Sequence, residues 1–192
     1  SASGGDAASD TIAASTFVNL IGSSSADSLT GDANANDLRG GAGADTLVGG
    51  AGDDTFYYDA SDTSVDGGAD TDIIEVEGSG INITLASITV SNIEVFDLNN
   101  GHNMITLSET SVGSSTDSNN TLRIDGASGI VAFSDASNWS FSTTENITVN
   151  SVLRTYNVYQ DLNDATIETV KIDARLEQPT ASDITPLETG AD

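Results

Sequence analysis

Residues 22–57 consist of four consecutive nine-residue blocks: GSSSADSLT, GDANANDLR, GGAGADTLV and GGAGDDTFY. The last two blocks match the pattern G-G-x-G-x-D-x-U-x, with U a large apolar residue, at every defined position. The first two keep the leading glycine, Asp or Asn at position six and Leu at position eight. A degenerate block at 58–66 and an in-phase block at 67–75 extend the series. Six blocks in one register predict a repeat architecture.

The spacing within each block predicts how one repeat is built. Six residues rich in Gly and Asp favour a turn, and the x-U-x segment favours a short strand whose middle side chain points inward. Two blocks make one coil, so turns 18 residues apart lie above one another on the same edge. The result is a flat parallel β-roll whose core is formed by the stacked apolar side chains of position eight, namely Leu29, Leu38, Leu47, Phe56, Val65 and Ile74.

Stacked turns bring the carboxylates of position six together, and like charges this close need a counter-ion. The chain has 30 acidic and 5 basic residues, for a formal charge of −25. A hard cation such as Ca²⁺, which takes six to eight oxygens from carboxylates and carbonyls, meets this need. A flexible Gly/Asp linker is the alternative, but the regular apolar residue at position eight disfavours it. We expect several calcium ions, with ligands on one edge at Asp27, Asp45 and Asp62, on the other at Asn36, Asp54 and Asp72, and also at Asp70.

These blocks resemble the calcium-binding RTX nonapeptide repeats of proteins that bacteria export by type I secretion. The resemblance covers residues 22 to about 75 and implies calcium binding and an extracellular location, but no particular activity. Asn36 and Thr63 depart from the Asp that the repeat carries at position six.

Beyond the repeats the sequence predicts further strands and very little helix. Alternation at period two in Ile81–Leu85, Asn92–Leu98, Met104–Leu107 and Leu122–Asp125 favours β-rungs stacked on the roll. Shorter spacings in 130–172 favour antiparallel hairpins. We therefore expect an all-β fold, a parallel β-roll or β-solenoid continued and capped by rungs and hairpins. The expected division is a linker and N-terminal cap (1–21), a calcium-binding β-roll (22–78), a β-rich ligand-binding region (79–176) and a linker or tail (177–192).

The second half is also similar to the region that follows RTX repeats in very large bacterial adhesins. The similar motifs are Asn92–Leu98, Leu122–Ala127, Trp139 and Tyr156–Tyr159. This resemblance implies a module near the outward end of a surface protein that acts in cell adhesion and biofilm formation. Some similar modules bind peptides with calcium.

A binding site in this half is expected to use aromatic side chains and turn oxygens. Trp139, Tyr156 and Tyr159 are candidates for a contact surface, because aromatics give contact area at low entropic cost, although core positions are the alternative. A chain this negative would repel the C-terminal carboxylate of a peptide unless a calcium ion bridged the two. The suspected calcium-bearing or ligand-binding oxygens belong to Asp97, Asn99, Asn100 and Asp125. A sugar-binding module and a structural spacer without its own ligand remain as alternatives.

Composition excludes several other classes of protein. The charge opposes binding to nucleic-acid phosphates, and no apolar run is long enough to insert in a membrane. There is no cysteine, no G-x-S-x-G and no H-E-x-x-H motif, so we expect no enzyme. The predicted partner is an extracellular peptide or protein on a host or neighbouring cell, or else a carbohydrate. The chain is expected to act as a monomeric module within a longer protein.

Overall fold

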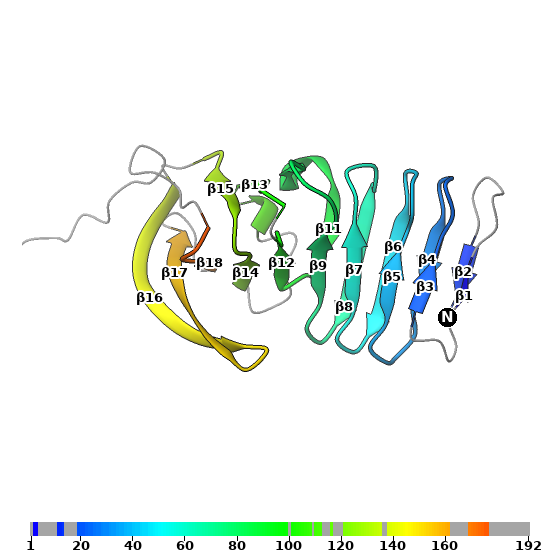
Figure 1. Cartoon of the computed structure of the whole chain (residues 1–192), viewed down its shortest axis with the longest axis horizontal. Coiled ribbons are helices and arrows are strands. Elements are labelled where there is room, and N and C mark those ends of the chain that lie inside the picture. Colours follow the sequence, from blue (N-terminus) through cyan, green and yellow to red (C-terminus); the bar gives the residue numbers. More distant parts are fainter. Residues whose placement is uncertain are drawn as a thin grey trace, which may run out of the picture.

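The computed structural model of this chain is a long β-structure in which coils follow one another along one axis (Figure 1). The described residues form three sheets, of ten, five and three strands. The prediction of an all-β, parallel solenoid is confirmed. The structure describes residues 2–3, 11–13, 19–99, 101–108, 110–112, 116, 121–135, 138–161 and 169–176. No helix in these residues is long and apolar enough to cross a membrane.

The ten-stranded sheet runs the length of the molecule and holds one strand from nearly every coil. Its strands, in spatial order, are β1 (Ala2–Ser3), β3 (Asn19–Ile21), β5 (Asp37–Arg39), β7 (Thr55–Tyr58), β9 (Ile73–Val76), β12 (Val95–Asp97), β14 (Thr121–Asp125), β18 (Thr169–Asp173), β17 (Val152–Asp161) and β16 (Trp139–Val149). Pairing is parallel as far as β18 and antiparallel from β18 through β17 to β16.

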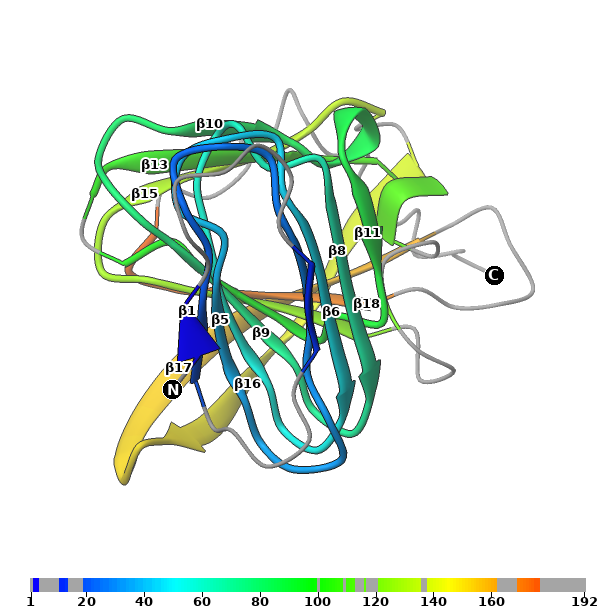
Figure 2. The ribbon, with the colours of Figure 1, turned by 90° about the vertical axis from the view of Figure 1, so that its right-hand side faces the viewer.

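The two smaller sheets close the coils from the other sides (Figure 2). The five-stranded sheet faces the first half of the long one and contains β11 (Thr89–Ser91), β8 (Ser64–Ala69), β6 (Thr46–Ala51), β4 (Ser28–Thr30) and β2 (Thr11–Ala13). The three-stranded sheet belongs to later coils and contains β10 (Asn82–Thr84), β13 (Asn103–Leu107) and β15 (Gly129–Phe133). A short 3-10 turn, η1 (Leu85–Ser87), follows β10.

One ladder of apolar side chains forms the spine of the core. Parallel register places each member opposite the next, and every one is completely buried: Leu20, Leu38, Phe56, Ile74, Phe96, Ile124 and Ile172. Leu38, Phe56 and Ile74 are position-eight residues of the repeat, as expected. The same ladder continues through strands outside the repeats, so both halves of the chain share one hydrophobic core.

The structure differs from the sequence prediction in the second half. Residues 130–133 belong to β15, which is parallel to β13 rather than part of an antiparallel hairpin. The hairpin expected further on is longer than predicted, since β16 is one strand of 11 residues. Strands within 1–21 pair with the roll, and residues 177–192 lie outside the described part of the chain. The boundaries at 22, 78 and 176 stay predictions.

Candidate functional site

The turns of the roll stack through their position-six side chains. The backbone N–H of Asp27 donates to Oδ1 of Asp45, 18 residues later, at 2.7 Å. On the opposite edge Asn36 N–H donates to Asp54 Oδ1 at 2.7 Å, and Asp54 N–H donates to Asp72 Oδ1 at 2.9 Å. Each carboxylate therefore uses one oxygen to tie its turn to the preceding coil, which leaves the second oxygen for another partner.

In Asp45, Asp54 and Asp72 that second oxygen is buried and accepts no hydrogen bond from a described N–H or hydroxyl, and the same holds for one oxygen of Asp62, whose other oxygen accepts from Asp59 N–H. The atoms are Oδ2 of Asp45, Asp54 and Asp72 and Oδ1 of Asp62, and the four residues are at most 4 % exposed. A buried charged oxygen without a partner is costly, and native proteins rarely keep one unless an ion or water completes it. These oxygens are therefore suited to hold a cation.

Leading glycines allow carbonyl oxygens to approach the same carboxylates. A Cβ on Gly49 would overlap both Oδ2 of Asp54 and the carbonyl oxygen of Gly67 in the next turn. The same holds at Gly31, between Asn36 Oδ1 and the carbonyl oxygen of Gly49. Glycine at position one thus lets a side-chain oxygen and a carbonyl of the adjacent coil lie close together, as a hard-cation site requires.

The pKa values of the buried carboxylates are raised, as expected for acidic groups that lack a nearby positive charge. Burial, with further contributions from neighbouring carboxylates, raises the pKa of Asp54 to about 6 and that of Asp62 and Asp72 to about 7. Burial also raises the pKa of Asp45. Without a cation these groups hold protons into the neutral range.

The structure groups the predicted metal ligands by edge, with one outlier. Asp27, Asp45 and Asp62 lie on one edge, and the other edge is formed by Asn36, Asp54 and Asp72. Asp70 is exposed, has φ of 81°, and accepts a hydrogen bond from Gly52 N–H, so it does not join the buried carboxylates. Among the described residues no three acidic or histidine side chains converge. A cation in these turns would therefore be held by carboxylates together with backbone carbonyls.

The prediction that Trp139, Tyr156 and Tyr159 form an exposed binding surface is wrong. They are 0 %, 0 % and 3 % exposed. Trp139 stacks on Phe133 with ring centroids 4.8 Å apart and donates from Nε1 to Asp135. Tyr159 packs edge-on against Phe133. These aromatics build the core of the capping strands.

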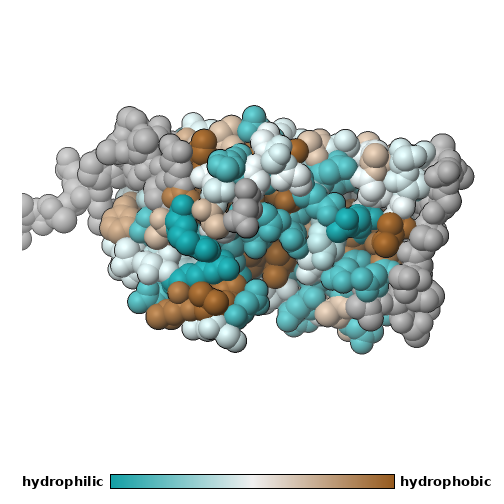
Figure 3. Space-filling model, viewed as in Figure 1, coloured by the Kyte–Doolittle hydropathy of each residue, from teal (hydrophilic) through white to brown (hydrophobic). Residues whose placement is uncertain are grey.

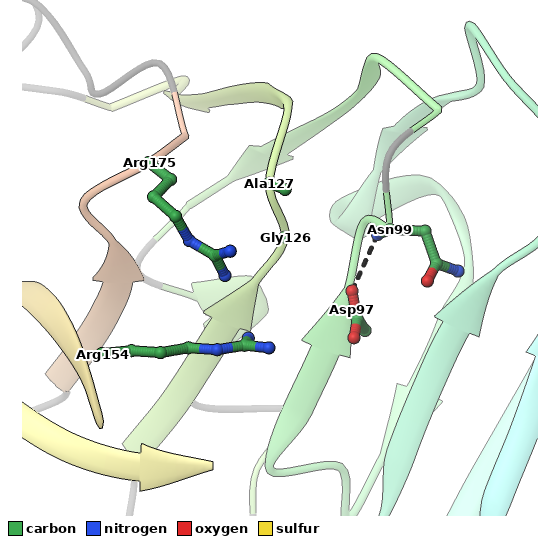
Figure 4. Close-up of a pocket in the computed structure, with 6 residues that line it drawn as sticks. All are labelled: Asp97, Asn99, Gly126, Ala127, Arg154 and Arg175. Carbon is green, nitrogen blue, oxygen red and sulfur yellow. Dashed lines mark hydrogen bonds between the residues drawn. The ribbon is translucent and has the colours of Figure 1, made fainter. Parts of the chain in front are cut away.

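Two of the suspected ligand-binding residues do line a cavity, of about 170 Å³, at the end of β12. Asp97 and Asn99 form one side, and the long side chains of Arg154 and Arg175 reach in from the other (Figure 4). Asn99 N–H donates to Asp97 Oδ1 at 2.7 Å, which fixes the carboxylate at the mouth of the turn. Asn100 lies outside the described residues.

Asp125, another suspected residue, does not line this cavity. It is 3 % exposed, pairs in register with Asp97, and accepts hydrogen bonds from Tyr156 Oη at 2.5 Å and Arg123 Nε at 3.1 Å. These partners occupy its carboxylate, so Asp125 holds strands β14 and β17 together.

The sequence reasoning missed Arg154 and Arg175. Arg154 has Nη1 3.6 Å from Asp173 Oδ2 and 3.9 Å from Asp125 Oδ2, and its buried Nε has no acceptor among the described residues. Arg175 donates from Nε and Nη2 to Asp173. A usable signal was present, because all but one of the 5 basic residues fall in 123–175.

Comparison with known protein families finds a match that falls within residues 19–65. Residues 19–47 and 30–65 match the family model of the RTX calcium-binding nonapeptide repeat, in four copies. Neither a curated protein sequence nor a solved structure shows significant similarity to the chain. Proteins with these repeats are typically exported by type I secretion. The stacked turns with their buried carboxylate oxygens thus coincide, over residues 19–65, with a match to RTX calcium-binding nonapeptide repeats.

Proposed function

We propose that the chain is a calcium-rigidified binding module of a type I-secreted bacterial surface adhesin, and that it binds the C-terminal carboxylate of an extracellular peptide. The observation that carries the proposal is the cavity in which Arg154 and Arg175 face Asp97 and Asn99. Its role in the parent protein would be cell adhesion or biofilm formation.

Charge favours an anionic ligand at this place in the molecule. The chain carries −25 overall, but three of its 5 basic residues lie around the cavity, namely Arg123, Arg154 and Arg175. The acids there are Asp97, Asp125, Asp173 and Glu75, which accepts a hydrogen bond from Asn99. A carboxylate therefore meets a much smaller excess of negative charge there than elsewhere on the chain. Guanidinium groups also present paired donors that fit the two oxygens of a carboxylate.

One arginine donor is available without breaking another bond. Arg154 Nε is buried and has no hydrogen-bond acceptor among the described residues. Burial of this donor without a partner is unfavourable, and a ligand carboxylate would satisfy it once a shift of the Arg154 side chain exposes the atom to the cavity.

An apolar surface adjoins the arginines and suits the last side chain of a peptide. A second hollow, of about 320 Å³, shares Arg154 and Arg175 and is lined by Val152, Leu153 and Ala174. Val152 and Leu153 are 57 % and 68 % exposed at the end of the β16–β17 hairpin. Figure 3 shows hydrophobic surface over this end of the hairpin, directly beside strongly hydrophilic surface. This juxtaposition favours a peptide with an apolar C-terminal residue over a sugar.

Calcium enters the proposal in two ways that an experiment can separate. Ions in the repeat turns stiffen the coils that present Asp97, and an ion held by oxygens of Asp97 and Asn99 would meet the ligand carboxylate directly. Both make binding calcium-dependent. If calcium contacts the ligand directly, the protein should still prefer a free C-terminal carboxylate after Arg154 is removed. If calcium only stiffens the repeat turns, that preference should be lost.

The test is fluorescence anisotropy with labelled pentapeptides that end in Leu, Val or Phe, each with a free or an amidated C-terminus, in millimolar calcium. Amidation and Arg154→Ala should each weaken binding at least 10-fold. Arg39→Ala is the matched control, since Arg39 pairs with Glu77 on the repeat half. Equal affinity for free and amidated peptides would overturn the carboxylate site. A complete lack of peptide binding would leave a spacer or a sugar-binding module. A free-carboxylate preference that survives Arg154→Ala would assign the contact to calcium.

A further inference from the structure

We propose that a further site for a hard divalent cation, of the calcium class, lies beyond the matched repeats, between the turn 67–72 and the short turn 92–94. Its carboxylates belong to Asp72 and Glu94. This inference does not depend on the proposed ligand.

The strand register gives Glu94 the place that Asp54 and Asp72 hold in the coils before it. Val95 pairs with Ile73, as Ile73 pairs with Thr55, so the residue preceding each one occupies the same position in its turn. Asp72 N–H donates to Glu94 Oε2 at 2.9 Å, which repeats the bond from Asp54 N–H to Asp72 Oδ1 at 2.9 Å. The carboxylate ladder therefore gains one more member, although the step is 22 residues instead of 18.

Asn92 takes the part of the leading glycine in this last turn. A Cβ on Gly67 would overlap the carbonyl oxygen of Asn92 and Oδ2 of Asp72, just as one on Gly49 would meet the corresponding oxygens of the coil below. Asn92 has φ of 54°, in the left-handed region that glycine and asparagine tolerate best. Its side chain donates to Asp66 Oδ1 at 2.8 Å, which anchors the turn on β8.

The buried carboxylate of Asp72 is the independent indication of a ligand. Asp72 is 0 % exposed, and its Oδ2 makes no hydrogen bond to any described residue. This oxygen and the Asn92 carbonyl approach the same point beside Gly67. Together with the neighbouring Glu94 carboxylate, which accepts from Asp72 N–H, they supply the oxygen donors that calcium prefers.

The nearest basic side chains are engaged with other acids. Arg123 and Lys171 line a hollow together with Glu94, but Arg123 donates from Nε to Asp125 and Lys171 Nζ lies 2.9 Å from Glu145. The carboxylate ladder also ends here. Arg123 pairs with Val95, so the next coil offers Leu122 at the position of Glu94.

The experiment counts bound ions by native mass spectrometry of the whole chain in calcium, with a calcium titration by calorimetry. Glu94→Gln keeps the size of the side chain and removes its charge. We expect it to bind one ion fewer, or to bind the last ion at least 10-fold more weakly. Glu145→Gln makes the same change on β16 and should alter neither quantity.

Circular dichroism in saturating calcium confirms that the Glu94→Gln variant keeps its strands. If that variant does not fold, Glu94→Asp retains the charge but shortens the reach, and the last binding step should weaken while the strand content stays. A native ion count and native affinity in Glu94→Gln, or a native last step in a Glu94→Asp variant, would overturn the proposal.

Discussion

Calcium removal at neutral pH should unfold the repeat half, and acidification of the calcium-free protein should partly restore it. The raised pKa values give the size of the effect. An unfolded Asp titrates near 3.8, whereas Asp54 in the fold titrates at about 6. Each unit corresponds to about 1.4 kcal/mol, so ionised Asp54 destabilises the calcium-free fold by about 3 kcal/mol at pH 7.

Asp62 and Asp72, with pKa values of about 7, make comparable or larger contributions. Together the three carboxylates destabilise the calcium-free roll by on the order of 10 kcal/mol, which matches the whole net stability of an ordinary domain. Because the folded pKa values lie above the unfolded value, the penalty is absent below about pH 4 and grows as the pH rises towards 7. Calcium reverses the sign by replacing the protons, so its affinity should increase over the same range.

Far-UV circular dichroism of calcium-free protein at pH 7 and pH 5, and of calcium-loaded protein at pH 7, measures this directly. We expect strand signal in the loaded sample, a large loss in the calcium-free sample at pH 7, and partial recovery at pH 5. Equal strand content with and without calcium at pH 7 would refute the reasoning, as would a calcium-free form that is less stable at pH 5 than at pH 7.

Three further substitutions test individual contacts. Asp45→Ala should remove a calcium ligand. With calcium at 100 times its Kd, the loss of that ion lowers the free energy of unfolding by about 2.7 kcal/mol. Asp183→Ala should leave this free energy unchanged, and equal melting curves for the two variants would contradict the predicted register. Gly49→Ala should reduce calcium affinity by crowding Asp54 Oδ2, as calorimetry would show, and an unchanged titration would argue against an ion there. Tyr156→Phe should cost about 1–3 kcal/mol in a chemical melt, because buried Asp125 loses its hydroxyl partner, with the ion count unchanged.

The repeat half could be predicted from its sequence because one period determines both the turn and the core. The leading glycine, position six and position eight each have one structural role, and the step of 18 residues determines which of them stack. A local pattern is then sufficient to give the long-range register. The repeat period does not predict Glu94, because the spacing from Asp72 is 22 residues instead of 18. A Glu also replaces the Asp or Asn of the earlier turns at that position.

The second half shows where a local pattern becomes insufficient. Residues 142–146 are exposed, so alternation disappears in the middle of β16 and the strand reads as two short pieces. The sequence around Tyr156 is compatible with a surface position, because its hydrogen-bond partner Asp125 lies 31 residues earlier in the chain. Arg154 and Arg175 come from different strands and meet only in the fold. The composition shows that basic residues are scarce, but it does not show that these two arginines line the same cavity.

The two halves of the chain surround their buried carboxylates in different ways. In the roll, Asp45, Asp54 and Asp72 have partnerless oxygens that suit a cation taken from solution. Beyond Glu94 the acidic ladder stops, and buried Asp125 and Asp173 are met by arginines of the chain itself.

Arginine differs from a bound ion in that it is covalently part of the chain and carries hydrogen-bond donors in a fixed geometry. A guanidinium shared between a structural carboxylate and a cavity can accept a second anion, as Arg154 is placed to do. The last acidic turn lies at the start of β12, and the cavity lies at its other end, at Asp97. Calcium bound at the turn would therefore order the strand that forms one wall of the cavity, so that ligand binding depends on calcium even where the ion never touches the ligand.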